Sequence, residues 1–181
     1  MATWIALLRG INVGGRKRLP MADLRRIFTD AGCRSVNTYI QSGNVVFSAT
    51  IRSTDRFARR IAAAIEAEFR FRPGIQLLTS NQLEQAIAEN PFANAVDDPK
   101  SLHVAFLDEV PGNDSVQRAK NLLAPSESCD LVGRNLYLHA PNGIARSKFA
   151  AQMEKTLGVG VTARNWRSTT KIAALAADVA H

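Results

Sequence analysis

Cysteine is scarce in this 181-residue chain, which contains only Cys33 and Cys129. The two cysteines lie far apart and form no C-x-x-C motif, so neither a zinc knuckle nor a redox pair is supported. The three histidines, His103, His139 and His181, show no spacing typical of metal ligands. We therefore expect no metal and no cofactor. A reducing compartment, the cytoplasm, fits the few thiols best.

Long apolar runs are also absent. The first apolar stretch, residues 4–8, is too short for a signal peptide, and no run approaches the ~18 residues of a membrane span. We therefore expect a soluble protein with no membrane partner. The hydrophobic fraction of 46% is ordinary for a globular protein, and a chain of this length can bury a core without metal or disulfide bonds.

Acidic residues are fewer than basic ones, which gives a formal net charge of +7 and a pI near 10.0. The excess lies in the first half: residues 1–90 carry 13 basic and 7 acidic side chains, whereas residues 91–181 carry 10 and 9. Such asymmetry favours a polyanion or a phosphorylated small molecule as a partner. A solvated, arginine-rich surface explains it equally well, and Arg52, Arg56, Arg59 and Arg60 are typical of a solvated helix face.

Hydrophobic periodicity predicts the same order of elements twice: strand, helix, hairpin, helix, strand, helix. In the first pass the strands fall at residues 4–8, 38–40, 45–47 and 75–78, and the helices begin at Pro20, Thr54 and Thr79. In the second pass the strands fall at residues 102–107, 129–132, 136–139 and 159–163, and the helices begin near Asn113, Ser147 and Ser168.

Each pass has the pattern of a split βαβ unit with an added C-terminal helix. The predicted fold class is therefore α+β, with two tandem ferredoxin-like repeats. Residues 1–93 would form the first unit, residues 102–181 the second, and the polar residues 94–101 the linker. The apolar runs at residues 4–8 and 102–107 indicate strands that are buried on both faces.

The sequence Leu-Arg-Gly-Ile-Asn-Val-Gly-Gly at residues 8–15 follows the first strand and precedes the basic run at residues 16–18. A glycine-rich loop of this kind can direct backbone N–H groups at an anion. It fits neither the dinucleotide fingerprint nor the P-loop. The predicted ligand-binding residues here are Arg9, Asn12, Gly14, Gly15, Arg16 and Lys17. Alternatively, the two adjacent glycines simply reverse the chain.

The tip of the first predicted hairpin carries Gln41, Ser42 and Asn44, which are uncharged hydrogen-bonding groups. Because amide side chains both donate and accept, they could contact a base or an amide of a ligand. A tight turn needs the same residue types, so the turn alone also explains them.

A third candidate segment comprises Asn165, Trp166, Arg167 and Lys171. A tryptophan beside an arginine can form a stacking platform for a base, although Trp166 could equally fill the core. The hydroxyls of residues 168–170 are expected to cap the last helix. His103 lies within an apolar strand and is interpreted as a packed histidine rather than a base.

Three segments resemble the signatures of domain-of-unknown-function family 1697, which is found mostly in bacteria. They are residues 8–15, residues 38–47 (Thr-Tyr-Ile-Gln-Ser-Gly-Asn-Val-Val-Phe) and residues 164–171 (Arg-Asn-Trp-Arg-Ser-Thr-Thr-Lys). The family usually has threonine where Ser168 stands here, a change that keeps the hydroxyl. The resemblance implies a two-part α+β fold of ferredoxin-like character, and it implies no established activity.

These patterns favour a binding module for a phosphate-bearing ligand, either nucleic acid or a nucleotide, at the glycine-rich loop. One alternative is a small-molecule enzyme with a polar cleft between the repeats. Another is an interaction or scaffold protein without a small ligand. No nucleophile–base pair is evident, so no catalytic residue is assigned.

Overall fold

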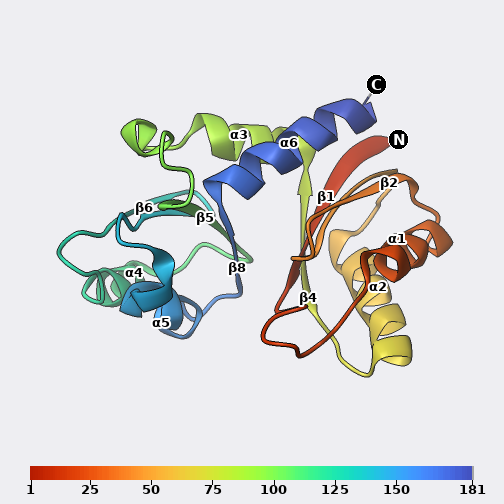
Figure 1. Cartoon of the computed structure of the whole chain (residues 1–181), viewed down its shortest axis with the longest axis horizontal. Coiled ribbons are helices and arrows are strands. Elements are labelled where there is room, and N and C mark those ends of the chain that lie inside the picture. Colours follow the sequence, from red (N-terminus) through yellow and green to blue (C-terminus); the bar gives the residue numbers. More distant parts are fainter. Residues whose placement is uncertain (181) are drawn as a thin grey trace. The chain divides into compact units, whose positions relative to one another are not determined.

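The computed structural model describes residues 1–180 and contains the predicted element order twice (Figure 1). The first pass comprises β1 (Ala2–Arg9), α1 (Met21–Asp30), β2 (Arg34–Tyr39), β3 (Asn44–Ala49), α2 (Thr54–Phe69), β4 (Gly74–Thr79) and α3 (Ser80–Ala88). The second comprises β5 (Leu102–Leu107), α4 (Asn113–Lys120), β6 (Ser128–Val132), β7 (Asn135–His139), α5 (Lys148–Leu157), β8 (Val161–Asn165) and α6 (Trp166–Ala180). The predicted α+β class is confirmed.

The strands form two antiparallel sheets of four strands each, in the orders β2-β3-β1-β4 and β6-β7-β5-β8. The first strand of each pass therefore lies inside its sheet, between two partners. Ile5, Leu7 and Leu8 on β1 are at most 1% exposed, and every residue of β5 is buried. Burial of both faces explains why the two strands are continuous apolar runs rather than alternating ones.

The core of the first sheet lies on the face covered by α1 and α2 (Figure 1). Phe28 of α1, Phe47 of β3 and Phe57 of α2 form an aromatic cluster at its centre. The Phe28 and Phe47 ring centroids are 5.0 Å apart in an edge-to-face arrangement, and the Phe47 and Phe57 rings stack at 5.6 Å. Both geometries are favoured by aromatic quadrupoles. The cluster fixes the position of α2 on the sheet.

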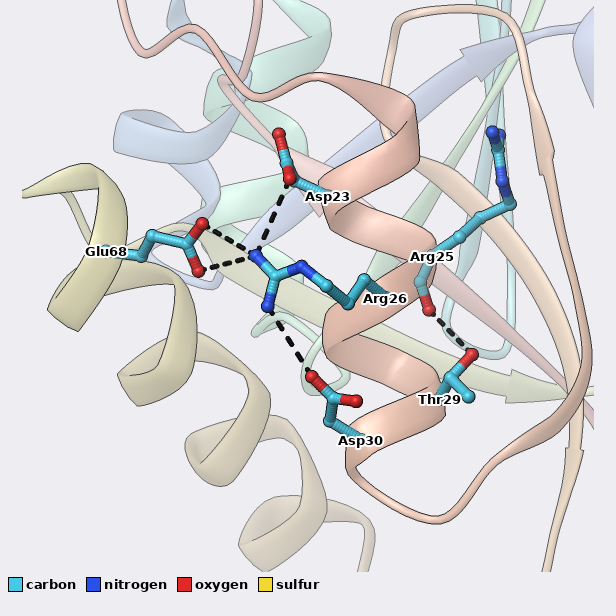
Figure 2. Close-up of polar contacts among 6 residues, drawn as sticks. All are labelled: Asp23, Arg25, Arg26, Thr29, Asp30 and Glu68. Atoms are coloured by element: carbon cyan, nitrogen blue, oxygen red, sulfur yellow. Dashed lines mark hydrogen bonds and ion pairs between the residues drawn. The ribbon is translucent and has the colours of Figure 1, made fainter.

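An arginine joins the two helices at the surface of this core (Figure 2). The Nη2 of Arg26 lies 2.6 and 2.7 Å from the two carboxylate oxygens of Glu68 on α2. Asp23 lies 3.5 Å from the same Nη2, and Asp30 lies 3.5 Å from Nη1. The hydrogen bond and charge of Glu68 raise the pKa of Arg26. The pair links α1 to α2 at half-exposed positions, where solvent weakens its contribution.

The second sheet packs one face against α4 and α5, with Phe149 and Met153 of α5 in its core. On β7, Tyr137 is completely buried, and its hydroxyl donates to the Ala86 carbonyl at 2.5 Å. Ala86 lies in the last turn of α3, where a helix leaves its carbonyls without intrahelical donors. The tyrosine thus caps a helix end 51 residues away in sequence.

The last helix begins two residues earlier than predicted, at Trp166 rather than at Ser168. Asn165 is the cap, because its Oδ1 accepts from the Ser168 N–H at 2.8 Å. The Thr169 and Thr170 hydroxyls instead donate to the carbonyls of Asn165 and Trp166, at 3.0 and 3.1 Å. The expectation that the hydroxyls of residues 168–170 cap this helix was therefore wrong.

The chain divides into two compact units, Met1–Glu84 with the segment from Lys171 onward, and Gln85–Thr170. These divisions fall within α3 and α6, whereas the predicted linker at residues 94–101 contains the end of a short 3-10 turn, Ala93–Ala95. The two compact units therefore have different boundaries from the two predicted repeats. The boundaries of the repeats stay a prediction. No helix within residues 1–180 has the length and hydropathy that crossing a membrane requires.

Burial of His103 on β5 gives a prediction for the pH dependence of stability. The side chain is 9% exposed, and burial lowers the pKa of its imidazole below the ordinary 6.5. Below pH 6.5 the unfolded chain therefore binds a proton that the folded protein resists, so stability falls as the pH drops. The free energy of unfolding should fall between pH 7 and pH 5 by about 1.4 kcal/mol for each unit of pKa depression.

Urea unfolding of the wild type and of His103→Leu at both pH values measures this effect. The variant should lose less stability on acidification than the wild type. Equal losses in the two proteins would show that His103 does not contribute to the acid sensitivity.

Candidate functional site

The glycine-rich segment forms a miniature hairpin at the end of β1. The Arg16 N–H donates to the Val13 carbonyl at 3.0 Å, and the Asn12 N–H donates to the Lys17 carbonyl at 3.1 Å. Gly14 and Gly15 occupy the turn with φ of +58° and +73°. Two consecutive positive φ angles are the requirement of a type I′ turn, which explains the two glycines. The glycines thus reverse the chain, the alternative that the sequence left open.

The side chain of Asn12 holds the base of this hairpin. Its Nδ2 donates to the carbonyls of Leu19 and Gln41, at 3.0 and 2.8 Å, and its Oδ1 accepts from the Leu19 N–H at 2.8 Å. The residue has φ of +54°, a conformation that asparagine tolerates better than most residues. Because both amide hydrogens are used internally, Asn12 orders the loop rather than offering donors to a ligand.

The tip of the β2–β3 hairpin is attached to the same region. The Leu8 N–H donates to the Gly43 carbonyl at 2.8 Å, and Asn12 contacts Gln41 as described above. Asn44 is completely buried, and its Nδ2 donates to the Tyr39 carbonyl and the Ser42 hydroxyl at 3.1 and 2.8 Å. The first two predicted segments therefore lie together, although Asn44 serves the hairpin itself.

Three consecutive cations cover the outside of this assembly. Arg16, Lys17 and Arg18 are exposed, and their side chains form no ion pair or hydrogen bond within residues 1–180. Val13 and Ile40, 68% and 53% exposed, add apolar surface to the loop and the hairpin tip. We call residues 12–18 the basic loop. Arg18 was not among the predicted site residues, although its place in the basic run was a signal for it.

Arg9 occupies a different position from the other predicted cations. It is the last residue of β1 and pairs with Gly74 of β4. Its guanidinium lies across Gly74, with Nη2 and Nε 2.6 and 2.7 Å from the point where a Cβ would stand. Only glycine leaves room for this arrangement. Arg9 therefore packs on β4 instead of extending from the basic loop.

The third predicted segment divides between the compact units, because Asn165, Trp166 and Arg167 belong to the second and Lys171 to the first. Asn165 caps α6, and Trp166 is only 6% exposed, as expected for a core residue. Arg167 and Lys171 are exposed. On β8, Arg164 was not predicted as a site residue; burial lowers its pKa to about 10, and its Nη1 donates to the Ala163 carbonyl.

The described residues provide no metal cluster, since no three His, Cys, Asp or Glu side chains gather within residues 1–180. Both cysteines are free. Burial raises the pKa of the Cys33 and Cys129 thiols to about 11, so both stay protonated and poorly nucleophilic at neutral pH.

Comparison with known proteins assigns the chain to a family. The family model described as "Protein of unknown function (DUF1697)" matches residues 1–137, a range that includes the basic loop and the first hairpin. The chain belongs to the DUF1697 family. The matched range of this DUF1697 protein ends before residues 164–171, the third segment of the predicted resemblance.

Among solved structures, the conserved bacterial protein SP0830 from Streptococcus pneumoniae is similar, with a TM-score of 0.72 and 22% sequence identity. The similarity covers 97% of the DUF1697 chain and 98% of the other chain. It shows that the two proteins share a fold. No curated protein matches the sequence.

Proposed function

We propose that this protein binds nucleic acid through the basic loop. The observation that carries the proposal is the exposure of Arg16, Lys17 and Arg18 on a loop whose base is fixed by Asn12. Cations without carboxylate partners are available to phosphates, and a loop ordered in advance loses little entropy on binding.

The form of the loop favours a polymer over a single nucleotide. Successive charges along an exposed segment suit successive phosphates of a backbone, and the exposed Val13 and Ile40 side chains could contact sugars or bases. Salt-dependent release of counterions would then dominate the affinity. The net charge of +7, concentrated in residues 1–90, supports the same partner.

We also infer that each repeat is a ferredoxin-like unit. The strand orders β2-β3-β1-β4 and β6-β7-β5-β8, with helices after the first and third strands, support this description. This fold alone does not specify a ligand, so the functional proposal depends on the basic loop.

The proposal predicts a salt-dependent affinity that the basic loop controls. Fluorescence anisotropy with labelled single-stranded and duplex oligonucleotides, over a range of salt concentrations, measures it. The triple variant Arg16→Ala/Lys17→Ala/Arg18→Ala should bind single strands at least ~10-fold more weakly at low salt. Its slope of log affinity against log salt should be shallower by about 2, as expected for three lost phosphate contacts.

A matched control removes the same charge from the second compact unit. Arg118, Lys148 and Lys155 are exposed on α4 and α5, and their triple alanine variant should keep the wild-type affinity within about twofold. If both triple variants lost the same affinity for oligonucleotides, binding would depend on net charge alone and not on the basic loop. Affinity that is undetectable, or that does not respond to salt, would refute nucleic-acid binding by this protein.

A further inference from the structure

A groove with a volume of about 300 Å³ lies where β3 leads into α2. Three of the residues that line it are arginines, and the others are hydroxyl-bearing or apolar. The lining comprises Thr50, Ile51, Arg52, Ser53, Arg56, Phe57 and Arg60. We call it the arginine groove. Its volume is at the lower end of the range for small-molecule sites, about 300–1,000 Å³.

The three guanidinium groups of the arginine groove are held in different ways. Arg60 is fixed, because its Nη2 donates to the Ala31 carbonyl at 2.5 Å and its guanidinium carbon lies 5.3 Å from the Phe57 ring centroid. Arg52 and Arg56 are exposed, and within residues 1–180 their side chains have no hydrogen-bond or ion-pair partner. The groove thus combines one rigid cation with two that can close on a ligand.

This concentration of charge is unfavourable in the absence of an anion. Arg56 and Arg60 are four residues apart on one helix, a spacing at which like charges repel each other. Asp55 is the acidic residue of the first turn of α2, but it does not line the groove. An anion between the arginines would relieve the repulsion. Arginine is also the side chain best suited to phosphate, because its planar fork matches two phosphate oxygens.

The charges around Arg60 favour the arginine groove over the space on its other side. A second groove of about 240 Å³ between α1 and α2 also contains Arg60, but Asp30 and Glu68 line it. Arg26 forms ion pairs with both of those carboxylates, as Figure 2 shows. The charged side chains of the second groove, Arg26 and Arg60 against Asp30 and Glu68, therefore cancel, whereas the arginine groove has three cations and no carboxylate in its lining.

The guanidinium groups, rather than the start of α2, provide the attraction. The Ser53 hydroxyl accepts from the Arg56 N–H at 3.3 Å, and the Ser53 carbonyl accepts from the Phe57 N–H at 3.1 Å. These two backbone donors are therefore already used. The lining offers a ligand cationic side chains together with the apolar Ile51 and Phe57.

We propose that the arginine groove binds a small phosphorylated molecule, with its phosphate between Arg52, Arg56 and Arg60 and its uncharged part against Ile51. This site is separate from the basic loop. Asn44, at one end of β3, pairs with Leu7, whereas Ala49, at the other end, pairs with Ala2. Five residue steps of strand, roughly 17 Å, separate these ends. The inference does not depend on nucleic-acid binding by the basic loop.

Titration of the full-length protein with inorganic pyrophosphate and with AMP tests the proposal, by calorimetry and by ¹H–¹⁵N NMR. Saturable binding with a Kd below ~1 mM is expected, with the largest amide shifts at residues 50–57. Arg52→Ala/Arg56→Ala should weaken binding at least ~10-fold. Arg52→Ala/Arg56→Lys, which restores the charge at position 56, should recover only part of that loss because ammonium lacks the planar fork.

Arg59→Ala is the matched control, since Arg59 is an exposed cation of the same helix that does not line the groove. It should leave the affinity within about twofold. Equal loss in Arg59→Ala, shifts centred on residues 12–18, or no saturation would each overturn the proposal. Circular dichroism of every variant identifies loss of folding. Oligonucleotide affinity of Arg52→Ala/Arg56→Ala should stay near wild type, which separates this site from the proposed function.

Discussion

Replacement of Gly43 by alanine should lower the free energy of unfolding by about 2–5 kcal/mol, which for a chain of this size threatens folding itself. Gly43 has φ of +75° in the tip of the β2–β3 hairpin. A Cβ there would lie 2.7 Å from the Leu8 Cβ and 2.8 Å from the Ile11 Cδ1. The left-handed backbone costs roughly 1–2 kcal/mol and the overpacking roughly 1–3 kcal/mol.

Gly14→Ala separates these two causes. Gly14 has φ of +58°, but nothing lies within 4 Å of the position that its Cβ would occupy. This variant should therefore lose only the conformational part, roughly 1–2 kcal/mol. Chemical denaturation of both variants measures the difference. If Gly43→Ala were as stable as Gly14→Ala, the result would contradict the close packing of Gly43 against Leu8 and Ile11.

Asn12→Ala should lower the free energy of unfolding by about 2–4 kcal/mol, because it removes three hydrogen bonds worth roughly 0.5–1.5 kcal/mol each. Those bonds join the basic loop to Leu19 and to Gln41 of the first hairpin. Without them the cations of the loop lose their fixed position. Oligonucleotide affinity should therefore also fall, although no charge is removed.

The matched control is Asn37→Ala. Asn37 is exposed on β2, and its Nδ2 makes one local hydrogen bond, to the Ser35 carbonyl at 3.2 Å. Its replacement should cost at most about 0.5 kcal/mol and leave binding unchanged. Denaturation curves and anisotropy titrations of the two variants test this. If Asn12→Ala binds like the wild type while it remains folded, a preordered loop is not needed for binding.

The sequence predicts the order of the elements well, because that order depends on local periodicity. Continuous apolar runs identified β1 and β5 as strands buried on both faces, and the structure confirms this burial. The start of α6 was misplaced because Asn165, Ser168, Thr169 and Thr170 are all residues that can cap a helix. Which of them does so depends on the backbone at the end of β8, which no local pattern specifies.

The candidate site was less predictable, because long-range contacts define it. Asn12 and Gln41 are 29 residues apart, and neither has a local signal for their hydrogen bond. The four arginines between residues 52 and 60 looked alike in sequence. Only the packing of α2 on Phe47 and Phe28 determines that Arg52, Arg56 and Arg60 line a groove and that Arg59 does not.

The central position of β1 affects how the protein is made. β1 is synthesised before both of its partners, β3 and β4, and β4 ends at Thr79. At about 5–20 residues per second, the ribosome needs roughly 4–14 seconds to go from the end of β1 to the end of β4. The apolar Ile5–Leu8 segment has two unpaired edges until β3 is available and one until β4 is available, and an unpaired apolar edge is the kind of surface that nucleates aggregation. The nascent chain should therefore be a chaperone client until β4 has emerged.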